Sequence, residues 1–148
     1  MEKPLRFGVG VFVFMFNKDF SKALLIKRNA EKRKKHGFTW GTPGGVLEFR
    51  EYALDGAIRE VNEEVGIKLD KNVVKLLEIK ELPNFSESVH GFNFSYGAII
   101  DEKTKITINE ESEGYQWFDI NKLPEGRKPG DNILAMAKLT KEKFKKKV

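Results

Sequence analysis

The amino-acid sequence predicts an α/β fold in which helices cover a mixed sheet. Three observations predict it: a run rich in valine and phenylalanine near the start, a helical apolar pattern over residues 52–65, and further strand-like runs on both sides of that pattern. Strands that surround one central helix, with another helix at the end, are typical of a sheet covered by helices. At 148 residues the chain is long enough to bury a core, and we expect one domain, 1–148.

The first 45 residues predict a hairpin followed by irregular chain. Residues 7–16 read as a buried strand because β-branched and aromatic residues dominate. Residues 17–22 supply turn residues, and 23–28 read as the returning strand. The polar, basic segment 29–37 is interpreted as a loop, and 38–45 as a short extended stretch that ends at a Pro-Gly-Gly break.

The clearest helix spans residues 52–65. Its apolar side chains recur at intervals of three and four: Leu54, Ala57, Ile58, Val61 and Val65. Gly66 follows, where a helix often ends on a glycine.

The second half of the chain predicts three or four strands and one helix. Strands are expected at 73–82, 89–100 and 114–120, and the segment 105–108 extends or pairs with the strand at 89–100. A last helix is expected to begin at Asp131 as its N-cap and to run towards residue 145.

Composition excludes several classes of protein. The chain has no cysteine, which excludes disulfides, thiolate zinc sites and cysteine nucleophiles. The apolar run 8–16 is too short to span a membrane, so we expect a soluble, cytoplasmic protein without a membrane partner. The net charge is +5, yet residues 45–67 alone carry −4. An acidic segment in a basic chain suits a metal site that receives a polyanion.

Three carboxylates crowd together on the predicted helix. Glu60, Glu63 and Glu64 have relative spacings i, i+3 and i+4, which place like charges on one face near the helix C-terminus. Like charges at these spacings repel one another, and the helix dipole disfavours anions at its C-terminus. A solvated acidic face is the alternative, but a hard divalent cation would relieve both the repulsion and the dipole effect. Arg59 stands four residues before Glu63 and is expected to pair with it. The crowding predicts that neutralising Glu60 or Glu64 stabilises the metal-free protein.

Residues 45–67 resemble the Nudix box. The fixed positions are Gly45, Glu51, Arg59-Glu60-Val61, Glu63-Glu64 and Gly66-Ile67, at the spacing that this motif has. The flanking segments 40–45 and 113–124 also resemble the family. One departure is Arg50, which stands where many members have glycine.

The resemblance implies a Nudix-type α/β/α sandwich with a mixed central sheet. It implies a pyrophosphohydrolase that cleaves a nucleoside diphosphate linked to another group, with Mg²⁺ as cofactor and Mn²⁺ as its alternative. The implied metal ligands are the Gly45 carbonyl, Glu60, Glu63 and Glu64. Arg59 would orient a glutamate, and Glu51 would bind the metal through water or support the site. The general base would be Glu60, Glu63 or a carboxylate of the later loop, which offers Glu110, Glu111 and Glu113; of these we select Glu113.

The substrate is less constrained. We expect Arg28 and Lys35 to contact phosphates and Phe85 to stack on a base. A nucleoside triphosphate is the first choice, because the chain is short and lacks an added N-terminal domain. An ADP-ribose or other sugar-nucleotide pyrophosphatase is the alternative. An RNA cap hydrolase, or a non-catalytic nucleotide- or RNA-binding module, is a further one. The expected partner is a small nucleotide, and the protein is expected to be a monomer or a homodimer.

Overall fold

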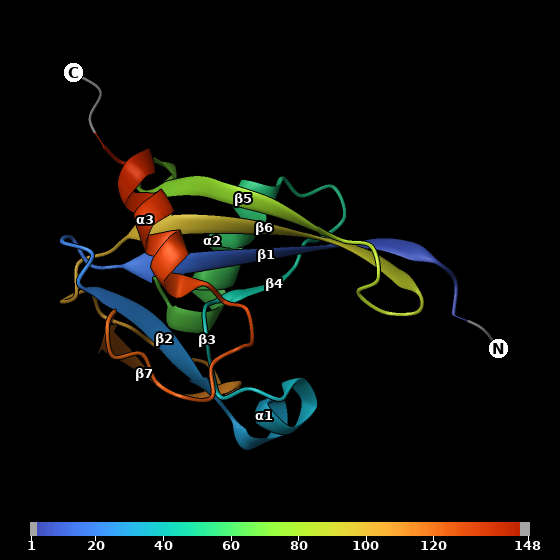
Figure 1. Ribbon diagram of the computed structural model, residues 1–148, viewed down its shortest axis with the longest axis horizontal. Coiled ribbons are helices and arrows are strands. Elements are labelled where there is room, and N and C mark those ends of the chain that lie inside the picture. Colours follow the sequence, from blue (N-terminus) through green and yellow to red (C-terminus); the bar gives the residue numbers. More distant parts are fainter. Residues whose placement is uncertain (1–2, 146–148) are drawn as a thin grey trace.

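The computed structural model describes residues 3–145 (Figure 1). Eleven elements follow one another: β1 (Arg6–Phe16), β2 (Lys22–Arg28), α1 (Ala30–His36), β3 (Trp40–Gly41), β4 (Gly44–Val46), α2 (Ala53–Val65), the 3₁₀ turn η1 (Lys71–Val73), β5 (Val74–Leu82), β6 (Val89–Ile99), β7 (Ser112–Asp119) and α3 (Ile133–Lys143).

One mixed sheet organises the fold. Its main path runs β3-β2-β1-β6-β5, with β4 added to β1 and β7 added to β2. The long pair β1–β6 is parallel, and the other pairs are antiparallel. Figure 1 shows α3 across one face of the sheet and α2 behind the other, so the predicted α/β/α sandwich is confirmed.

Strand β1 supplies the centre of both cores. Val11, Val13 and Met15 belong to the cluster under α2, whereas Phe14 and Phe16 belong to the cluster under α3. Successive side chains of a strand point to opposite faces, so a strand covered on both faces has no polar side. Each such burial stabilises the fold by roughly 1.5–3 kcal/mol. This explains the continuous apolar run that predicted the strand.

The main elements agree with the sequence predictions within one or two residues. Helix α2 begins one residue later than expected, at Ala53, and Gly66 ends it in the left-handed conformation with φ 69°. The hairpin β1–β2 and the strands β5, β6 and β7 are confirmed at similar bounds.

Segment 29–37 is not a loop, and this prediction was wrong. Residues 30–36 form α1, because the Asn29 side chain accepts a hydrogen bond from Lys32 N and Gly37 adopts φ 78° as the C-cap. Both capping signals are in the sequence. The high charge of the segment, which buries no residue, concealed them.

Two further expectations are corrected. Residues 105–108 form no strand, because Thr107 N donates to Val65 O at the end of α2 and so the segment is tied to the helix. Helix α3 begins at Ile133 with Asn132 as its N-cap, and the expected cap Asp131 instead pairs with Arg127 at 3.0 Å.

None of the helices within residues 3–145 is both long and apolar enough to cross a membrane. The lysine-rich end at 146–148 lies outside the described residues.

Candidate active site

Helix α2 presents its carboxylates to the loop that precedes it. Ala57, Val61 and Val65 are fully buried against the sheet, which orients the helix around its axis. Glu60 and Glu64 consequently lie beside β4, whereas the side chain of Glu63 is 53% exposed.

Glu64 is the buried acid of the site. Only 7% of the residue is exposed, and its Oε2 accepts a hydrogen bond of 2.7 Å from Gly44 N. Burial raises the pKa of this carboxyl to about 8, against the lowering effect of the Gly44 hydrogen bond. The charge of Glu60 raises it further but is a smaller cause. Burial, more than the crowding of like charges, therefore makes the ionised helix face unfavourable.

Glu60 packs against the backbone of Gly45. A Cβ atom at Gly45 would lie 2.5 Å from Glu60 Oε1, so only glycine leaves room for this carboxylate. Burial raises the pKa of Glu60, and the Arg59 guanidinium, 3.0 Å away, lowers it.

Arg59 is the hub of the acidic cluster. Its Nε and Nη2 contact the two carboxylate oxygens of Glu51 at 2.8 and 3.0 Å, and its Nη1 reaches Glu60 at 3.0 Å and Glu63 at 3.3 Å. The predicted Arg59–Glu63 pair is present, but the bidentate contact with Glu51 is shorter. That contact lowers the pKa of Glu51. Arg59 thus holds its neighbours in place, since a fork of two hydrogen bonds fixes geometry as well as charge.

The donor set of this cluster fits a hard divalent cation. Buried carboxylate oxygens next to a glycine backbone are what Mg²⁺ prefers, and the site has no sulfur or imidazole ligand among the described residues. No three acidic or histidine side chains of residues 3–145 already surround one point. The Arg59 guanidinium lies among Glu51, Glu60 and Glu63, so an ion that binds here competes with Arg59 for Glu60.

The loop before β7 is tied to the end of α2 by a hydrogen bond of 3.2 Å from Asn109 Nδ2 to Glu63 O. The charge of Glu111 raises the pKa of both Glu60 and Glu64. Glu113 lies elsewhere: it pairs with Arg33 at 2.9 Å and with Lys27 at 3.9 Å. The Glu111 carboxylate pairs with Lys32 at 3.5 Å, so both loop carboxylates have a cationic partner on α1, and the charge of Glu111 acts on the box carboxylates.

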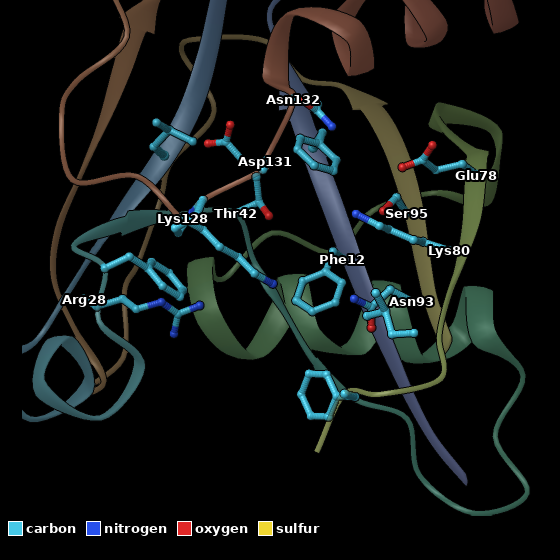
Figure 2. Close-up of a pocket in the computed structure, with 18 residues that line it drawn as sticks. Phe12, Arg28, Thr42, Glu78, Lys80, Asn93, Ser95, Lys128, Asp131 and Asn132 are labelled. Carbon is cyan, nitrogen blue, oxygen red and sulfur yellow. The ribbon is translucent and has the colours of Figure 1, made fainter. Parts of the chain in front are cut away.

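A cavity of about 280 Å³ opens on the α3 face of the sheet (Figure 2). Aromatic, cationic and amide side chains converge on it from distant parts of the chain; among its lining residues are Phe12, Arg28, Phe38, Phe85, Asn93, Lys128 and Asp131. Arg28 and Phe85 were expected near the substrate and do line the cavity, whereas Lys35 lies on the exposed surface of α1 and does not.

Two cations lie over aromatic rings in this cavity. The Arg28 guanidinium is 4.8 Å from the Phe38 ring, and Lys128 Nζ is 4.6 Å from the Phe12 ring. Burial lowers the pKa of Lys128, and the charge of Arg28 lowers it further. Arg28 Nε is buried and has no hydrogen-bond partner within the described residues. Arg28 also lowers the pKa of Glu64, so its charge acts on the cavity and on the acidic cluster alike.

Comparison with known proteins shows the family. The model of the NUDIX domain matches residues 5–140. The chain belongs to the Nudix family.

The similar Nudix proteins differ in length and in substrate. Nudix hydrolase 6 of Arabidopsis thaliana is 38% identical over 76 residues, which cover 51% of this chain and 25% of that protein. The chain thus spans about a quarter of that relative. The dihydroneopterin triphosphate diphosphatase of Haemophilus influenzae is 26% identical over 139 residues, which cover 86% of this chain and 84% of that protein. The crystal structure of a MutT NUDIX hydrolase from Burkholderia pseudomallei has 24% identity and a TM-score of 0.69, covering 90% of this chain and 98% of that one, and supports the fold.

Arg50, which stands where many Nudix proteins have glycine, has a strained backbone conformation. Arg50 adopts φ 68°, a left-handed conformation that glycine enters without cost. The glycine common at this position therefore reflects a backbone requirement, which this chain meets with arginine.

Proposed function

We propose that this Nudix protein is a metal-dependent nucleoside triphosphate pyrophosphohydrolase that releases a nucleoside monophosphate and pyrophosphate. One observation carries the proposal: the cavity with aromatic walls and the acidic cluster of α2 are linked through β4, where Phe12 of the cavity pairs with Gly44 and the Gly44 N–H donates to Glu64. Arg28 lines the cavity, and its charge also acts on Glu64. A substrate with a flat base at one end and a polyphosphate at the other fits this arrangement, with the base in the cavity and the polyphosphate at the acidic cluster.

The cavity suits one nucleobase. Phe12, Phe38 and Phe85 offer ring faces on which a base can stack. Lys128 and Arg28 donate hydrogen bonds, and Asp131 accepts them. A base with a carbonyl beside a ring N–H and an amino group presents the complementary pattern. Guanine and the pterin ring share that edge, so we propose a guanine- or pterin-type triphosphate as the substrate class. The similarity to the dihydroneopterin triphosphate diphosphatase of Haemophilus influenzae is consistent with this choice.

The acidic cluster would hold Mg²⁺ through Glu60, Glu64 and the Gly45 carbonyl. Bound Mg²⁺ would neutralise the phosphate oxygens and lower the pKa of water. Arg59 keeps Glu60 in place, and the Gly44 N–H keeps Glu64 in place. Their contribution is preorganisation, because both carboxylates are oriented before the substrate arrives.

Cleavage requires a carboxylate that takes the proton of the attacking water. The water oxygen forms a bond to a phosphorus of the triphosphate, the P–O bond to the bridging oxygen breaks, and the proton passes to the base. Glu63 is accessible at the rim of the cluster, and Glu111 lies on the loop that Asn109 attaches to Glu63 O. These two side chains are our candidates for the base.

A nucleotide panel tests the proposal. The protein is incubated with GTP, dGTP, dihydroneopterin triphosphate, ATP, ADP-ribose and capped RNA, with Mg²⁺ or Mn²⁺, and pyrophosphate, phosphate and nucleotide products are quantified. We expect pyrophosphate from guanine- and pterin-type triphosphates, and loss of turnover with chelator. Glu63→Gln and Glu64→Gln are expected to reduce turnover at least roughly 100-fold.

The matched control is Asp55→Asn on the same helix, where Asp55 pairs with Lys71 at 3.2 Å, away from the cluster. It should retain full turnover. Faster cleavage of ADP-ribose or capped RNA than of any triphosphate would overturn the substrate assignment. Turnover that survives both glutamine substitutions would overturn the assignment of the site.

A further inference from the structure

Helix α1 and the loop 109–113 interlock through Asn29. The backbone N–H of Asn29 donates to Glu111 O at 2.9 Å, and its side-chain Nδ2 donates to Glu110 O at 2.9 Å. The remaining group of the amide, Oδ1, caps α1 by accepting from Lys32 N at 2.8 Å. One residue therefore begins the helix and holds the two peptide carbonyls on either side of the Glu111 Cα atom.

Arg33 adds a second connection one helical turn later. Its Nη1 pairs with Glu113 at 2.9 Å and also donates to Arg28 O at 2.7 Å. The hydrogen bond from Arg33 is the largest cause that lowers the pKa of Glu113, so the carboxylate is ionised in this pair. The same guanidinium thus joins the loop to the backbone of a cavity residue.

The other side of the loop is attached to α2. Asn109 Nδ2 donates to Glu63 O at 3.2 Å, and Thr107 N donates to Val65 O at 2.9 Å. The loop consequently bridges the N-terminus of α1 and the C-terminal end of α2. Between these two attachments stands Glu111, whose carboxylate pairs with Lys32 of α1 at 3.5 Å.

We propose that Asn29, Arg33 and Glu113 form a clamp that holds the loop 109–113, and with it Glu111, at the C-terminal end of α2. Arg33 and Glu113 are positioning residues in this arrangement, and Glu113 does not itself contact the reacting atoms. The inference rests on the proposed function, since Glu111 matters only where α2 binds a metal and a polyphosphate. The clamp replaces the expectation that Glu113 is a base.

The clamp differs from an ordinary surface ion pair because it fixes the position of a loop. An exposed pair adds little to global stability. A loop has a low free energy of local opening, so a weak contact decides where its side chains lie. A displacement of about 1 Å in a reacting group lowers a rate by as much as roughly 100-fold. We therefore expect large kinetic and small thermal effects from the same substitutions.

The test compares Arg33→Met, Glu113→Ala and their double variant with Lys35→Met, which removes a cation from the same helix where no ion pair is present among the described residues. Glu113→Ala is expected to lower kcat roughly tenfold with an unchanged KM for the nucleotide. Arg33→Met should lower kcat equally and also raise KM, because it releases the Arg28 backbone. The double variant should match Arg33→Met, since the pair can be broken only once. Lys35→Met should behave like the unmodified protein.

Two measurements need no substrate. Hydrogen exchange of the peptide covering residues 107–115 should accelerate in Arg33→Met and in Glu113→Ala, and Mn²⁺ titration followed by electron paramagnetic resonance should show weaker binding in both. Unchanged exchange and Mn²⁺ affinity would overturn the clamp. So would a Glu113→Ala loss of roughly 100-fold or more with Arg33→Met near normal, which identifies Glu113 as the base itself. If the unmodified protein cleaves nothing on the panel, the proposed function fails, and the exchange and Mn²⁺ measurements still decide the clamp.

Discussion

Replacing Glu64 by glutamine is expected to stabilise the metal-free protein at alkaline pH. The folded-state pKa of Glu64 is raised to about 8 from the ordinary 4.5. Between these two pH values the folded protein binds more protons at this site than the unfolded chain does. The free energy of unfolding therefore falls as pH rises from 4.5 to 8, and the full penalty applies above pH 8.

The size of the effect follows from the burial of the carboxylate. At about 1.4 kcal/mol per pH unit, raising the pKa from 4.5 to about 8 costs about 5 kcal/mol at pH 9 and about 3 kcal/mol at pH 7. Glutamine keeps an oxygen that can accept from Gly44 N, but its buried amide hydrogens cost about 1–2 kcal/mol. The net gain at pH 9 is about 3 kcal/mol, which raises Tm by about 6–12 °C.

Thermal unfolding followed by circular dichroism in chelator, at pH 5 and pH 9, measures this gain. At pH 5 less than about 1 kcal/mol of the penalty remains, so the cost of the buried amide dominates and Glu64→Gln should melt about 1–5 °C below the unmodified protein. Glu63→Gln is the control, because Glu63 is half-exposed and its neutralisation relieves no burial. Excess Mg²⁺ should stabilise the unmodified protein and leave Glu64→Gln nearly unchanged. A lower Tm for Glu64→Gln at pH 9, or a difference independent of pH, would refute the argument that burial raises this pKa.

Three further predictions concern backbone positions. Arg50→Gly should raise the free energy of unfolding by up to about 1 kcal/mol in urea, because glycine enters φ 68° without strain; a decrease would mean that the Arg50 side chain makes a stabilising contact. Gly97→Ala should lower it by about 1–3 kcal/mol, because the new Cβ would meet an α3 side chain, whereas Gly114→Ala, with open space around it, should not; equal effects would contradict the packing. Gly45→Ala should weaken Mn²⁺ binding in calorimetric titration by displacing the Glu60 carboxylate; unchanged affinity would exclude that carboxylate as a ligand.

The repetitive elements were readable from the sequence because their signals are local. Valine and phenylalanine over residues 7–16 predicted β1, and the helical spacing before Gly66 predicted α2 within one residue. The caps of α1, Asn29 and Gly37, are equally local signals, but the segment between them is highly charged and has no apolar stripe, which favours a loop. Residues 105–108 have strand-like composition, yet Thr107 bonds to the end of α2, and no local pattern encodes that choice.

The sequence by itself determined the two-sided core, the central helix and the acidic face of that helix, since spacing along one chain sets which side chains share a face. Only the tertiary structure decided that the loop before β7 is attached to both α1 and α2, with Glu113 paired to Arg33, and that Lys128 and Asp131 join Arg28 around one cavity. About 100 residues separate Arg28 from Lys128 along the chain. The physical reason is that contacts between distant segments depend on how strands pair and how helices pack, and the local spacing of residues does not determine either.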